Sequence, residues 1–148
     1  MSELFNTPFE AGMRVLLILY AIKPRGASID RITTYDFMAI YGKDFGITAF
    51  NLHGNTPFNF SEFPSKRSLI KKGIKDYALD GMIVVNQSSS GFQYKLSRTG
   101  IAFVESLDTN YSQQYLEAIS KIHQVYSRKS DATIMKEINT KAITTLRR

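Results

Sequence analysis

The stretch SKRSLIKKGIKDYALDGMI, from Ser65 to Ile83, decides the fold. Ser65 follows a proline and can cap a helix, and the apolar positions after it recur at helical spacing until Gly81. At about 100° per residue, the cationic side chains gather on the face opposite the apolar one. These cations are Arg67, Lys71, Lys72 and Lys75. The segment therefore predicts an amphipathic helix with one basic face.

A β-hairpin is predicted directly after this helix. The segment Met82–Gln87 is rich in apolar and β-branched residues, Ser88–Gly91 has turn composition, and Phe92–Leu96 alternates apolar with polar positions. The helical period then returns, with Ser97 or Thr99 as the cap. Helix, short hairpin and renewed helix in this order predict a winged helix-turn-helix.

Two further helices are predicted before this unit. Thr7 and Pro8 form a helix start, and the following run Val15–Ile22 is apolar on nearly all sides. Such a helix belongs in the middle of a structure or in a subunit interface. The run is far shorter than the roughly 20 residues that cross a bilayer, so no membrane partner is expected. The second helix is predicted from Ser28 to Gly42.

A long loop, residues 43–64, separates the second helix from the third. DNA-reading helix-turn-helix units usually connect their helices by about three or four residues. The loop is rich in glycine, asparagine and phenylalanine, and a loop of this length is usually functional or disordered. Its aromatic content favours packing on the domain or on a partner. The candidate partner-interface residues are Phe45, Phe50, Phe58, Phe60 and Phe63.

The C-terminal part is predicted to be helical. Asn110 caps one helix with an apolar stripe, and Asp131 opens another. The fold class is therefore mainly α with a small β-hairpin: a winged helix-turn-helix with a long loop between helices 2 and 3 and extra C-terminal helices. Residues 1–108 form the winged-helix domain, and residues 109–148 form a helical extension that packs on the domain or on a partner.

Composition limits the function classes. Apolar residues make up 43% and charged residues 22% of the 148 residues, which is typical of a soluble globular chain. The chain has no cysteine, which excludes disulfides and thiolate metal sites and fits a cytoplasmic location. The net charge of +6 favours anionic partners without naming one.

No catalytic constellation is visible in the sequence. The two histidines are interpreted as a loop residue, His53, and a partly exposed helix residue, His123, since no metal-ligand spacing connects them. Phosphate-binding loops of the GxxxxGK[ST] and GxGxxG kinds are absent from the sequence. We therefore expect no enzyme activity, no cofactor and no metal. An enzyme would instead depend on His53 or His123.

The basic helix leaves two interpretations open. The candidate DNA-backbone-binding residues are Lys66, Arg67, Lys71, Lys72, Lys75 and Lys95. Lysine outnumbers arginine there, and the helix has no asparagine or glutamine, so reading of base edges is disfavoured. Non-specific contact with double-stranded DNA and a merely solvated basic face remain as alternatives.

Four segments together resemble a known family. NTPFEAGMRVLLILYAI, SIDRITTYDFMAIYGKDF, SKRSLIKKGIKDYALDGMI and YKLSRTGIAFVESLDTNYSQQYLEAI are similar, in this order, to the small middle components of bacterial ABC-three-component systems. These include the small subunit of Lamassu-type anti-phage defence. The resemblance covers roughly residues 6–126 and leaves the tail, residues 127–148, outside.

The resemblance implies a non-catalytic winged-helix adaptor. Its partners would be an SMC-like coiled-coil ATPase and an effector subunit, often a nuclease, and it would bridge the two. ATP hydrolysis and DNA cleavage would then belong to those subunits. The alternative is a free-standing winged-helix transcription regulator that binds DNA as a dimer.

Overall fold

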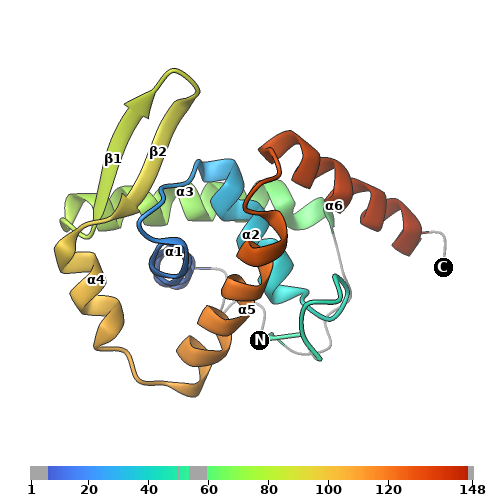
Figure 1. The fold of residues 1–148 in the computed structure, drawn as a ribbon, viewed down its shortest axis with the longest axis horizontal. Helices are drawn as coiled ribbons and strands as arrows, with labels where there is room; N and C mark the ends of the chain where they lie inside the picture. Colours follow the sequence, from blue (N-terminus) through green and yellow to red (C-terminus); the bar gives the residue numbers. More distant parts are fainter. Residues whose placement is uncertain (1–6, 50, 54–59, 147–148) are drawn as a thin grey trace.

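Helices and one hairpin make up the described part of the chain (Figure 1). The computed structural model describes residues 7–49, 51–53 and 60–146. The elements are α1 (Pro8–Ile22), α2 (Ile29–Ile40), the short 3-10 helix η2 (Phe60–Glu62), α3 (Phe63–Leu79), β1 (Ile83–Ser88), β2 (Gly91–Leu96), α4 (Arg98–Glu105), α5 (Asn110–Tyr126) and α6 (Asp131–Leu146). This confirms the predicted mainly α fold with a small β-hairpin.

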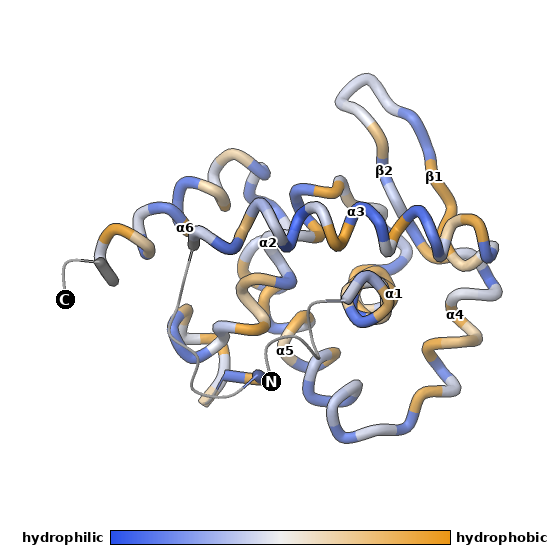
Figure 2. Tube along the Cα trace, turned by 180° about the vertical axis from the view of Figure 1, so that it is seen from behind, coloured by the Kyte–Doolittle hydropathy of each residue, from blue (hydrophilic) through white to orange (hydrophobic). Residues whose placement is uncertain are grey.

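Helix α1 lies in the middle of the fold. Figure 2 shows it end-on, with α3, α4 and α5 around it, and it also contacts α2. Val15, Leu16 and Ile18 are completely buried within this one chain. The apolar character of α1 on nearly all sides is therefore explained by core packing, because other helices cover its sides.

Helices α1 and α3 cross at two glycines. A Cβ atom on Gly73 would lie 2.8 Å from the Cα atom of Gly12 and 2.9 Å from the carbonyl oxygen of Pro8. No side chain fits in that space, so glycine at this position allows the two backbones to approach closely. The crossing fixes which face of α3 is buried, and this face carries Ile70, Ile74 and Tyr77.

The hairpin follows α3 and projects away from the helices (Figure 1). Its antiparallel register runs from Ile83 opposite Leu96 to Ser88 opposite Gly91. Gly91 has a φ of +111°, a value that favours glycine in the tight turn. Strand β2 is also held from its other side, because Ala27 and Tyr94 exchange two backbone hydrogen bonds of 2.9 and 2.8 Å.

Two predicted helix starts are wrong by one or two residues. Helix α3 begins at Phe63, so Ser65 lies inside it and does not cap it. Pro64 is accepted in the first turn because that turn needs no hydrogen bond from the missing N–H group. Helix α5 is capped by Thr109 rather than by Asn110. Thr109 and Ser112 form a reciprocal capping box, with hydrogen bonds of 3.0 and 3.3 Å.

The C-terminal helices pack on the rest of the chain. Ile119 and Ile122 of α5 and Ile134 and Ile138 of α6 are completely buried. Their apolar stripes therefore contribute to the core of this chain.

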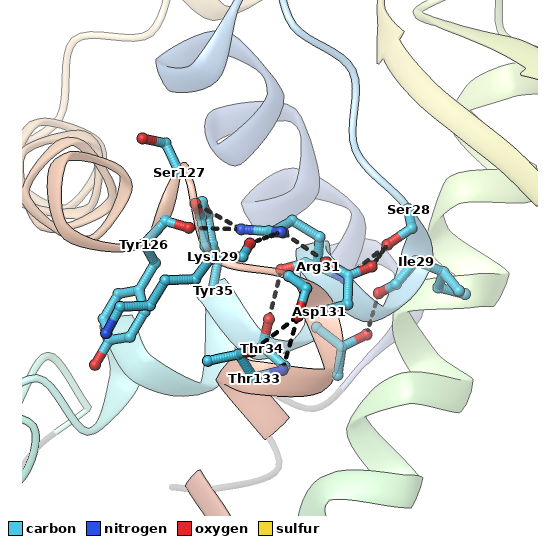
Figure 3. A network of polar contacts seen from close by, with 12 residues as sticks. Ser28, Ile29, Arg31, Thr34, Tyr35, Tyr126, Ser127, Lys129, Asp131 and Thr133 are labelled. Carbon is cyan, nitrogen blue, oxygen red and sulfur yellow. Dashed lines mark hydrogen bonds and ion pairs between the residues drawn. The ribbon is translucent and has the colours of Figure 1, made fainter. Parts of the chain in front are cut away.

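Arg31 of α2 forms an ion pair and hydrogen bonds with the turn between α5 and α6 (Figure 3). The Arg31 guanidinium pairs with Asp131 at 2.7 Å and donates to the carbonyl oxygens of Tyr126, at 2.8 Å, and Lys129. Asp131 also accepts a hydrogen bond of 2.7 Å from Ser28, the residue that caps α2. One buried side chain thus donates to backbone carbonyl oxygens at the end of α5 and in the turn that follows it.

Candidate interaction surface

The solvent side of α3 is basic, as the sequence predicts. Lys71, Lys72 and Lys75 are exposed and follow one another at helical spacing, while the opposite stripe is buried. These three lysines line one groove together with side chains of the hairpin. They are the part of the predicted DNA-backbone set that the structure gathers on one surface.

The other three predicted cations lie elsewhere. Lys66 is only 6% exposed, because it shares the buried face of α3 with Ile70; its placement on the basic surface is wrong. Arg67 forms an ion pair of 2.8 Å with Asp30 of α2. Lys95 stands opposite Val84 in the hairpin, one position out of phase with the residues that face α3. Because side chains alternate along a strand, Lys95 lies on the other face of the hairpin.

An apolar surface on the hairpin and the end of α3 adjoins the three exposed lysines. On the hairpin, Val85 and Tyr94 form one cross-strand pair, and Phe92 lies two positions from Tyr94 on the same face. With Leu79 of α3 these side chains line a groove of about 680 Å³. The candidate interaction surface is thus the groove between α3 and the hairpin, with an apolar part and three lysines.

The predicted aromatic interface is divided among different surroundings. Phe63 is 6% exposed and packs against Phe37, with ring centroids 5.7 Å apart, so it belongs to the core and not to an exposed surface. Phe45 is half-buried and packs on the core. The predictions for Phe50, Phe58 and the Phe60 side chain lie outside the described residues.

A cluster of buried charges lies at the centre of the helices, and sequence reasoning does not find it. The Arg14 guanidinium of α1 pairs with the Asp36 carboxylate of α2 through Nε–Oδ1 at 2.8 Å, with both side chains almost fully buried. The Tyr115 hydroxyl of α5 donates to the same carboxylate oxygen. Burial alone would raise the pKa of Asp36, but the positive charges of Arg14 and Lys66 hold this pKa below its ordinary value. Asp36 is therefore charged in the fold.

The same buried charges affect the pKa of Lys66. Burial lowers the pKa of Lys66, and the nearby carboxylate of Asp36 offsets part of that effect. The cluster thus draws one side chain from each of α1, α2, α3 and α5. A buried charge network of this kind requires all of its members in place, because a charge left without its partner is costly.

Both histidines are engaged with tyrosines. His53 Nε2 lies 2.6 Å from the Tyr111 hydroxyl, and His123 Nδ1 lies 2.9 Å from the Tyr35 hydroxyl. Burial lowers the pKa of His53 to about 4, and burial also lowers the pKa of His123. Within residues 7–49, 51–53 and 60–146, no group of three or more His, Cys, Asp or Glu side chains is placed to hold a metal ion. The helices of the same residues include none that is long and apolar enough to span a membrane.

Fold and surface together define a small, mainly helical protein with a projecting hairpin and a basic, partly apolar groove. The family described as ABC-three component (ABC-3C) system Middle Component 2 matches residues 4–148, and the chain belongs to it. The match includes the tail that the resemblance leaves out. The protein is therefore a component of a multi-subunit anti-phage system, which implies partner subunits. No curated protein and no solved structure matches the chain.

Proposed function

We propose that this protein is a non-catalytic winged-helix adaptor of a Lamassu-type complex, in which it bridges an SMC-like coiled-coil ATPase and a nuclease-type effector. Membership in the Middle Component 2 family over residues 4–148 carries the proposal, because a middle component works together with other subunits. The winged-helix assignment is supported by the order of α2, α3 and the hairpin, and by the return to helix in α4.

The non-catalytic part of the proposal is supported by the state of the two histidines. Each is bonded to a tyrosine, and burial depresses the pKa of each, so both have roles inside the fold. Turnover of ATP or DNA by the purified chain, lost on changing His53 or His123, would contradict this part.

Co-expression with the products of the flanking genes tests the adaptor role. The expected result is a single complex on size-exclusion chromatography that contains this chain, a large coiled-coil ATPase and an effector. Omission of this chain should separate the other two subunits. A chain that elutes alone in the presence of both would refute the proposal.

Contact with the DNA backbone is a second candidate function, favoured by the three exposed lysines of α3. Each phosphate contact releases counterions, so this binding should weaken steeply with salt and show no sequence preference. A footprint on one palindromic site would instead support the transcription regulator.

The double variant Lys71→Glu, Lys75→Glu tests this contact. Both side chains are exposed, so folding should be intact while DNA association of the complex is weakened. Unchanged affinity at low salt would show that this face is only solvated.

A further inference from the structure

Three large apolar side chains remain uncovered in one place. Leu79 is 78% exposed, Phe92 55% and Val85 44%, and all three line the groove of about 680 Å³ between α3 and the hairpin. Single exposed apolar residues are ordinary on a protein surface, but a contiguous group that lines a groove marks a binding site. Leu79 is the last residue of α3, whereas Val85 and Phe92 belong to the two paired strands of the hairpin. The fold therefore brings side chains from three elements to one groove.

The groove carries positive charge beside its apolar part. Lys71, Lys72 and Lys75 line it along α3, and none of the described residues that line it is acidic. An occupant must therefore offer apolar side chains to the hairpin and negative charge to α3. Electrostatic complementarity of this kind selects the partner and sets its register.

We propose that this groove binds an amphipathic helix of a partner subunit, apolar on one face and flanked by aspartate or glutamate. The proposal rests on the adaptor function and names the chemistry of one of its contacts. Helices of this kind anchor themselves through side chains at positions i, i+3 or i+4, and i+7, and α3 presents its lysines at the same spacing.

A helix fits better than an extended strand. Val85, Phe92 and Tyr94 project from the face of the hairpin, not from its hydrogen-bonding edge. A strand lying on that face would leave its own N–H and C=O groups without partners. A helix satisfies its backbone internally and needs only the side-chain contacts that the groove offers.

A second copy of this chain fits the groove poorly. Two copies that met through this surface would bring the lysines of both together, and the chain as a whole carries a net charge of +6. DNA would match the lysines, but its phosphates gain nothing from Leu79 and Phe92. The apolar and basic parts together therefore favour an acidic amphipathic helix.

The test measures binding of each purified flanking-gene product to this chain by biolayer interferometry. Leu79→Asp and Phe92→Asp place a charge in the apolar part, and Lys71→Glu with Lys75→Glu reverses the basic part. Val125→Asp is the matched control, because Val125 is 54% exposed on α5 and does not line the groove. Circular dichroism and thermal unfolding establish that each variant is folded.

The groove variants should weaken binding of one partner by at least about tenfold, while Val125→Asp leaves it unchanged. Hydrogen exchange of that partner should then show protection of one helical segment with acidic residues. Lysine substitutions at those acidic positions should restore binding to the Lys71→Glu, Lys75→Glu variant.

Other results would overturn the inference in distinguishable ways. Equal binding of a partner to the wild type and all variants removes the groove as the site but leaves the adaptor role intact. Failure of every flanking-gene product to bind removes the adaptor role and this inference with it. A 30-base-pair duplex that loses affinity only in the lysine variant, with partner binding unchanged, assigns the surface to DNA. A concentration-dependent dimer abolished by Leu79→Asp assigns it to self-association.

Discussion

Replacing Asp36 with asparagine should destabilise the fold strongly. The substitution keeps the size of the side chain but removes the negative charge that lies against the buried Arg14 guanidinium, which is 3% exposed. Removing one partner of a buried ion pair typically costs roughly 3–5 kcal/mol of the free energy of unfolding. For a chain of this length about 1 kcal/mol corresponds to about 2–4 °C, so Tm should fall by roughly 6–20 °C.

The assay is urea unfolding followed by circular dichroism at pH 7, with Asp30→Asn as the matched control. Asp30 pairs with Arg67 at the same 2.8 Å as Asp36 with Arg14, but the two side chains are 50% and 41% exposed. An exposed pair of this kind contributes only about 0–1 kcal/mol, because water screens both charges. The two variants thus remove the same kind of Asp–Arg ion pair, once where it is buried and once where it is exposed.

Equal destabilisation by Asp36→Asn and Asp30→Asn would refute this reasoning. A double-mutant cycle with Arg14→Met sharpens the test, since the double variant should lose less stability than the sum of the single variants.

The dependence of stability on acid pH provides an independent check. The pKa of Asp36 is lower in the folded state than in the unfolded one, so its stabilisation is present above the unfolded pKa and is lost as the pH falls through the folded pKa. Asp36→Asn should lack this part of the acid sensitivity.

Three further variants test other contacts. Arg31→Ala should cost about 2–3 kcal/mol and accelerate hydrogen exchange in the turn between α5 and α6, because the carbonyl oxygens of Tyr126 and Lys129 lose the guanidinium donor; unchanged exchange would contradict this. Gly73→Ala should cost about 1–3 kcal/mol in urea unfolding, since its Cβ would lie 2.8 Å from the Cα atom of Gly12, and a neutral result would show that α1 and α3 can separate. The folded-state pKa of His53, about 4, is below its ordinary value of 6.5, so the unfolded chain binds the proton first and stability falls as the pH drops from 6.5 towards 4. His53→Gln should reduce that slope, and an identical slope in both proteins would place the effect elsewhere.

The elements that sequence alone predicts are those set by local patterns. The apolar run Val15–Ile22 predicts a helix in the middle of the structure or in a subunit interface, because a helix without a polar side has to be covered on all sides, and α1 lies in the middle. The turn composition of Ser88–Gly91 predicts the hairpin, and the two strands do pair, with Ser88 opposite Gly91. Periodicity also divides α3 correctly into a buried face and a basic face.

Local sequence patterns do not predict which side chains of different helices contact one another. Arg14 and Asp36 lie 22 positions apart, and their pairing depends on how α1 and α2 are placed, which periodicity does not specify. Lys66 is a different case, because its spacing of four from Ile70 puts it on the apolar stripe and could have placed it inside. The exposed groove also escapes prediction: alternation in the hairpin shows which residues share a face, but not whether another element covers that face.

The buried cluster and Leu79, the most exposed apolar residue of the groove, lie at different ends of α3, and this separates two kinds of variant. Lys66 belongs to the first turn of the helix and joins the charges of Arg14 and Asp36, whereas Leu79 closes the helix at the groove. At 1.5 Å per residue the two positions are about 20 Å apart along the axis. Changes in the cluster loosen the packing that orients α3, so they should reduce stability and partner binding together. Changes at Leu79 remove a contact surface that the fold itself does not use, so they should reduce binding alone.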